Sequence, residues 1–182
     1  MKTFLPLVLG ALSFFSTTPA VVGVDDSFNC FPNSATLVAA ILGVSNSGVG
    51  YTYVDPDGND YGLIRDWCFA STLTDFSNLF ESKTNFNAPI GGWDVSSVTD
   101  MFATFAEATA FNQPLNEWNV SSVIDMANMF HGASAFNQNL CAWGAKMNEL
   151  PQPHVGGMFA SSGCDSPDNP QFTLSPSMNL CT

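Results

Sequence analysis

A phenylalanine–asparagine pair recurs at a constant step in this chain. Phe86, Phe111 and Phe136 stand 25 residues apart, and a tryptophan follows each of them seven residues later. A fixed period of about 20 to 50 residues is typical of solenoids, in which each unit buries its apolar side only against its neighbours. The sequence therefore predicts a repeat solenoid, and any function is expected on a surface that repeats.

Each unit is predicted to contain a short strand, a capped short helix and a turn. Leu115, Trp118 and Val120 are apolar at alternating or near-alternating positions, which favours a strand with Trp118 and Val120 facing inward. Val123 and Met126 begin a run of apolar residues at helical spacing, continued by Met129 and Phe130. The fold class expected from this pattern is an α/β repeat solenoid.

Aspartates mark the predicted start of each short helix. Ser97-Val98-Thr99-Asp100 and Ser122-Val123-Ile124-Asp125 have the form of a helix start, and Asp75 stands one unit earlier. Hydroxyl and carboxylate oxygens at such positions accept hydrogen bonds from backbone N–H groups that the helix leaves unpaired.

Asparagines also recur once per unit. Asn87, Asn112 and Asn137 are predicted to form a buried ladder whose amides pair with loop carbonyls of adjacent coils. A stripe of asparagines that binds a ligand is the alternative.

The ends of the chain differ from the repeats. The N-terminus has the order of a secretory signal peptide, with Lys2, an apolar run from Phe4 to Phe15 and then small residues. A membrane anchor is the alternative, but the run is shorter than the roughly 20 residues that span a bilayer. We therefore expect a signal peptide at residues 1–23, an N-terminal cap at 24–60, the solenoid at 61–164 and a tail rich in cysteine and proline at 165–182.

The N-terminal cap is expected to contain a helix. Asn33 or Ser34 can cap a helix from Ala35 to Leu42 that ends near Gly43. Because this segment carries no charge, it should be largely covered by the first coil.

Charge excludes several classes of partner. The 182-residue chain has 4 Lys plus Arg against 16 Asp plus Glu. Removal of Lys2 with the signal leaves 3 − 16 = −13. Such a chain repels nucleic acid and anionic lipid. An acidic surface serves solubility, or binds a divalent cation or a basic partner.

The cysteines favour an extracellular protein. In a secreted chain without Cys-x-x-Cys spacing they indicate disulfides more than metal ligands. An odd number leaves at least one unpaired or linked between chains. The disulfide candidates are Cys30, Cys68, Cys141, Cys164 and Cys181.

No constellation of residues predicts catalysis. His131 and His154 are the only histidines, and neither belongs to a nucleophile or metal motif. We therefore expect no enzyme, no catalytic residue, no metal site and no cofactor.

Two local motifs have competing interpretations. The stretch from Asp55 to Asp60 resembles the start of a calcium loop, but its Asp-Pro-Asp-Gly is also simply a turn. Asn119-Val120-Ser121 is a glycosylation sequon. A glycan on Asn119 would exclude that face as a partner site.

The repeated residues resemble the BspA-like family of surface-protein repeats, which is related to leucine-rich repeats. The resemblance rests on Trp93-Asp94-Val95-Ser96 with Met101 and Phe105, and on the equivalent residues from Trp118 to Leu140. It implies leucine-rich-repeat-like coils in a secreted or surface-displayed module associated with adhesion or protein binding. The family register also places Cys141 and Cys164 on neighbouring turns, with Cys181 as the competing partner of Cys164.

The expected function is therefore binding. The candidate surface is the outward row of Asp94, Ser96, Asn119 and Ser121, which would meet an extracellular protein or glycan. The alternative is a structural extracellular component that associates with itself. Nothing in the sequence identifies the ligand.

Overall fold

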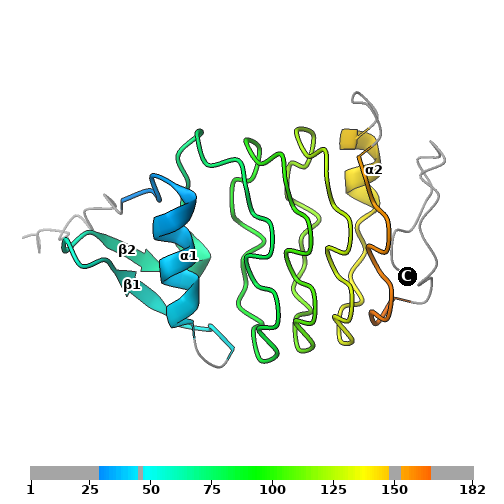
Figure 1. Cartoon of the computed structure of the whole chain (residues 1–182), viewed down its shortest axis with the longest axis horizontal. Helices are drawn as coiled ribbons and strands as arrows, with labels where there is room; N and C mark the ends of the chain where they lie inside the picture. Colours follow the sequence, from blue (N-terminus) through cyan, green and yellow to red (C-terminus); the bar gives the residue numbers. More distant parts are fainter. Residues whose placement is uncertain (1–28, 45–46, 148–152, 165–182) are drawn as a thin grey trace, which may run out of the picture.

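The computed structural model describes residues 29–44, 47–147 and 153–164. Its named elements are α1 (Ser34–Gly43), β1 (Thr52–Val54), β2 (Asp60–Leu63), the 3-10 helix η1 (Ile64–Asp66) and α2 (Cys141–Met147). The predicted signal peptide at residues 1–23 and the tail at 165–182 lie outside the described residues. Figure 1 shows α1 and the β1–β2 hairpin at one end, and α2 toward the other.

The predicted α/β solenoid with leucine-rich-repeat-like coils of strand plus helix is wrong. Within the described residues the named sheet is two-stranded and antiparallel, pairs β1 with β2, and precedes the Phe86-Asn87 pair. Between η1 and α2 the chain has turns and isolated bridges instead of strands and helices. Parallel bridges join Asp75 to Asp100, Asp100 to Asp125, and Asp125 to His154.

Consecutive stretches of 25 residues, which we call segments, nevertheless lie side by side (Figure 1). Residues 101–108 show why helical spacing does not give a helix here. The N–H of Ala106 bonds to the carbonyl of Ala103 at 3.0 Å, whereas the N–H of Phe105 bonds to Met129 in the next segment at 2.8 Å. Alternate N–H groups thus close a turn or bridge two segments, whereas in an α-helix each would bond four residues back.

Left-handed backbone angles accompany this alternation. Ala103 has φ 51° and Glu107 has φ 57°, and equivalent residues of the other segments share the conformation. A right-handed helix cannot continue through such residues. The helical prediction failed because the apolar period alone does not distinguish a helix from a run of turns.

Aromatic rings fill the core in columns. Phe80, Phe105, Phe130 and Phe159 stack with centroids 5.2 to 5.6 Å apart and planes within 3°. Trp67, Trp93, Trp118 and Trp143 form a second column with centroids 6.0 to 6.5 Å apart. Offset or tilted ring contacts of this kind add to the stabilisation from burial.

Each of the last three tryptophans also makes a hydrogen bond between segments. The indole N–H of Trp118 donates to the carbonyl of Ile90 at 3.0 Å, and Trp93 and Trp143 do the same with Ile64 and Leu115. Trp118 and Val120 are buried, as predicted.

The helix predicted near the N-terminus is present as α1. The Asn33 side chain caps it by accepting a hydrogen bond from the Thr36 N–H at 3.0 Å. Leu37 and Ile41 are buried, but Val38 is 45% exposed and Leu42 73% exposed. The expectation that this helix is largely covered is therefore wrong for one of its faces.

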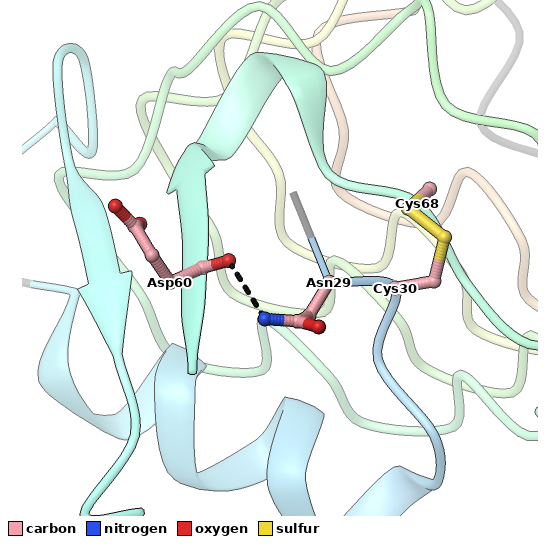
Figure 2. Close-up of a disulfide and its surroundings, with 4 residues drawn as sticks. All are labelled: Asn29, Cys30, Asp60 and Cys68. Carbon is pink, nitrogen blue, oxygen red and sulfur yellow. Dashed lines mark hydrogen bonds between the residues drawn. A yellow bond between two sulfur atoms is a disulfide. The ribbon is translucent and has the colours of Figure 1, made fainter. Parts of the chain in front are cut away.

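A disulfide and backbone contacts join this end to the rest of the molecule. Cys30 is bonded to Cys68, and Figure 2 shows the neighbouring hydrogen bond from the Asn29 side chain to the Asp60 carbonyl, 3.5 Å long. Phe31 bridges Phe69 in parallel.

Candidate binding groove

A shallow groove of about 310 Å³ crosses three consecutive segments. Two rows of equivalent positions line it, each row stepping by 25 residues. One row is Asn78, Ala103 and Asn128, and the other is Glu81, Ala106 and His131. Phe102 and Glu107 complete the lining. Three copies of the same turn therefore build the groove, with different side chains at each level.

Backbone conformation explains the asparagines of the groove. Asn78 and Asn128 both have φ 56°. Among residues with a Cβ atom, asparagine adopts this left-handed region with the least strain. The turns consequently place carboxamide groups on the groove at two levels.

The groove is acidic. Glu81 and Glu107 both line it, and no lysine or arginine is among its lining residues. The Oε1 atom of Glu107 lies 3.3 Å from Nδ1 of His131, with the two side chains 53% and 43% exposed. The Glu107 carboxylate also lies against Gly132, where an added methyl group would collide with it.

An aromatic side chain stands beside these polar groups. Phe102 is 38% exposed. Of the large hydrophobic residues that are exposed in the described part of the chain, it is the one with an aromatic ring. Its backbone N–H donates to the Asp100 carboxylate at 2.8 Å, which holds the turn that carries it. The groove thus combines carboxylates, amides, an imidazole and a ring.

Sequence reasoning missed this groove. His131 belongs to no nucleophile or metal motif, and no pattern in the sequence marks Phe102 as a binding residue. A usable signal was present, because asparagine recurs at positions 78 and 128, 50 residues or two periods apart, beside apolar core positions.

The residues predicted to bind lie elsewhere. Asp94 and Asn119 are exposed and Ser96 and Ser121 are half-buried. None of the four is in a strand: the two serines are in turns, and Asp94 and Asn119 lie two residues before them. None of them lines the groove. Their role in binding stays a prediction.

These turns have a common geometry. The Asp94 carboxylate accepts a hydrogen bond from the Ser96 N–H at 3.0 Å, and the Asn119 side chain accepts one from the Ser121 N–H at 3.3 Å. Hydrogen bonds from the Ser96 side chain and backbone hold the pKa of Asp94 below its usual range. The sequon at Asn119 is therefore in an exposed turn.

The predicted capping aspartates have the expected chemistry in a different structure. Asp100 accepts from the N–H two residues on, as do Asp75 and Asp125, each at 2.8 Å. The bonds close turns in place of helix ends.

The asparagine ladder also differs in detail. The Asn112 side-chain oxygen accepts a hydrogen bond from the Asn137 backbone N–H at 3.0 Å. The Asn87 side-chain oxygen accepts one from the Asn112 backbone N–H, also at 3.0 Å. Glutamines supply the amide donors, since Gln138 donates to the Asn112 carbonyl at 3.2 Å. Asn87 and Asn112 are half-buried and Asn137 is exposed, so the ladder is less buried than predicted.

The stretch from Asp55 to Asp60 forms the turn of the β1–β2 hairpin. The Asp55 carboxylate accepts hydrogen bonds from the backbone N–H groups of Asp57 and Asn59, the Asn59 amide and the Tyr61 hydroxyl, at 2.8 to 3.1 Å. The Asn59 side chain contributes most to a lowered pKa for Asp55. Within the described residues, no three His, Cys, Asp or Glu side chains gather as metal ligands would.

Two of the disulfide candidates are paired with each other, namely Cys30 and Cys68. Cys164 is also disulfide-bonded and is buried. Cys141 is the half-buried first residue of α2, and Cys181 lies outside the described residues.

Comparison with known proteins identifies a family. In the part of the chain that the structure describes, no helix is long and apolar enough to cross a bilayer. No curated protein and no solved structure matches the chain. The family model described as "Mycoplasma protein of unknown function, DUF285" matches residues 59–163, which include every residue that lines the groove. Since this match covers more than half of the 182 residues, the chain belongs to the DUF285 family.

Proposed function

We propose that this protein is a secreted or cell-surface protein that binds an extracellular protein or glycan and catalyses no reaction. The observation that carries the proposal is the groove lined by equivalent turns of three segments. Repeated backbone that presents different side chains at each level is a suitable platform for recognition, because the scaffold holds the side chains in place while their chemistry varies.

The proposed location has separate support. A disulfide between Cys30 and Cys68 is typical of chains that fold in an oxidising compartment. The DUF285 match and the resemblance to BspA-like surface repeats agree with display outside the cell. The disulfide and the family match bear on where the protein acts more than on what it binds.

Two surfaces compete for the partner. The groove offers concavity, charge and a ring, whereas the turns at Asp94 and Asn119 offer exposed polar groups at one register. The groove is favoured because its side chains line one common surface. Asp94 and Asn119 lie at two separate turns.

Binding of the mature protein to arrays of extracellular proteins and glycans tests the function. A partner found in this way is then measured against two double variants, Phe102→Ala with Glu107→Gln in the groove, and Asp94→Ala with Asn119→Ala in the turns. We expect a loss of about tenfold or more for the groove variant, as for a central contact of an interface.

The result has clear alternatives. Binding lost only in the Asp94 and Asn119 variant would move the site to those turns and keep the function. Absence of binding to every arrayed protein and glycan would overturn the function itself.

A further inference from the structure

We propose that the groove binds the lysine or arginine side chains of an extended basic segment in a partner protein. This inference rests on the proposed function and selects a protein over a neutral glycan as its partner. It follows from three features of the groove, which are its charge, its exposed ring and its carboxamides.

Charge favours a cationic occupant. The titratable lining groups are Glu81, Glu107 and His131, and no lysine or arginine lies among them. Asp100 is close to the groove, because its carboxylate accepts a hydrogen bond from the backbone N–H of the lining residue Phe102 at 2.8 Å. The whole chain has a formal charge of −12, so the surrounding field draws cations toward the surface.

The exposed ring gives the site more than charge. Phe102 is partly exposed and lines the groove together with Glu81 and Glu107. A lysine or arginine side chain carries an apolar stem and a cationic head, and both parts interact favourably with an aromatic face. A divalent cation has no apolar stem to place on the ring and prefers oxygen ligands.

The carboxamides supply the remaining acceptors. Asn78 and Asn128 stand at equivalent positions two segments apart, one on each side of Ala103. Their oxygen atoms can accept hydrogen bonds from an ammonium or guanidinium group, which has donors only. Repetition of the turn along the groove suits a segment with several basic residues better than one isolated cation.

Fluorescence anisotropy with a labelled peptide of eight lysines provides the test, on the full mature protein. The groove variant is Glu81→Gln with Glu107→Gln. The matched control is Asp57→Asn with Glu117→Gln, which removes two charges from exposed residues outside the lining. We expect the groove variant to weaken binding about tenfold and the control less than about twofold, since the contact charges act at short range.

A second pair of variants tests the ring. Phe102→Ala is compared with Ile124→Ala, because Ile124 is also exposed, at 57%, but does not line the groove. We expect about a three- to fivefold loss for Phe102→Ala, as for a removed cation–π contact, and no change for Ile124→Ala. Circular dichroism and thermal unfolding show whether each variant keeps the fold.

The outcomes separate the inference from the function on which it rests. Equal weakening by the two charge variants, or no binding of the peptide at about 0.15 M salt, would overturn the basic-segment inference. If neutral oligosaccharides then bind and the groove variants reduce that binding, the proposed function survives with a glycan as partner. If neither peptide, oligosaccharide nor arrayed protein binds, both proposals fail.

Discussion

The Asn112 side chain shows how a single residue joins two segments. Its oxygen accepts hydrogen bonds from the Asn137 backbone N–H at 3.0 Å and from the Gln138 amide at 2.7 Å. Replacement by alanine leaves both donors without this acceptor. We expect Asn112→Ala to lower the free energy of unfolding by about 1 to 3 kcal/mol.

Thermal and urea unfolding measure this loss, with Asn112→Asp as the control. Aspartate keeps an acceptor oxygen at the same place and should retain more of the stability than alanine. Equal destabilisation by both substitutions would mean that the amide acts in some other way than as an acceptor.

Asp55 provides a residue whose contribution depends on pH. Four hydrogen bonds to its carboxylate hold its pKa below the usual range, with the Asn59 side chain as the largest cause. Because the folded-state pKa is the lower one, the carboxylate stabilises the hairpin above the unfolded pKa of about 3.9. That contribution is lost as the pH falls through the folded-state value.

Nuclear magnetic resonance can follow both effects. The Asp55 carboxyl carbon should titrate below about 3.9, and amide protection at Asp57 and Asn59 should fall over the same pH interval. Titration of Asp55 at or above that value would contradict the hydrogen-bonded geometry.

The turn that carries Gly132 requires glycine at that position. Gly132 has φ 70°, and a methyl group there would collide with the Glu107 carboxylate. We expect Gly132→Ala to destabilise the protein by about 1 to 3 kcal/mol. The same substitution should displace Glu107 in the groove.

Gly92→Ala is the matched control for this turn. An added methyl group at Gly92 meets no atom within 4 Å. Urea unfolding of the two variants should therefore differ clearly. Comparable stability would show that the turn at Gly132 relaxes without cost.

The sequence predicted some elements and misjudged others for physical reasons. The burial of Trp118 and the helix capped by Asn33 follow from apolar periodicity and capping chemistry, and both were found. The short helix predicted after Asp125 was not found. Met126 and Phe130 are buried there in a run of turns, so their apolar spacing does not require a helix. Hydrogen bonds to another segment decide between these structures. Here they join residues 28 positions apart, such as Phe130 and Met158, and no local pattern records them.

Helical and strand periodicities could not predict the groove, for a related reason. Its charge could be read from composition, but its lining comes from three segments whose register is set by backbone pairing. The left-handed turns that bring Asn78 and Asn128 to the surface are also invisible to helical and strand periodicities.

At the scale of the whole molecule, the disulfide joins Cys30, which precedes α1, to Cys68, which follows Trp67. The two cysteines are 38 residues apart. Replacement of both cysteines by serine should lower the free energy of unfolding by about 2 to 4 kcal/mol, as expected for a loop of this length. Calorimetry of the oxidised wild type and the double variant measures the change. An unchanged melting temperature would show that α1 and the β1–β2 hairpin hold this end without the covalent bond.

The regular step between bonded segments has a kinetic consequence. The side-chain bond from Asn137 to Asn112 spans 25 residues, and so does the one from Asn112 to Asn87. The loop that must close when a segment joins its neighbour therefore has nearly the same length each time, 25 residues from Asp100 to Asp125 and 29 from Asp125 to His154. Its entropic cost hardly grows along the chain, because that cost rises only with the logarithm of loop length. Folding can start at one pair of segments and advance by nearly equal steps, so a longer relative with more segments should not face a higher barrier for each addition.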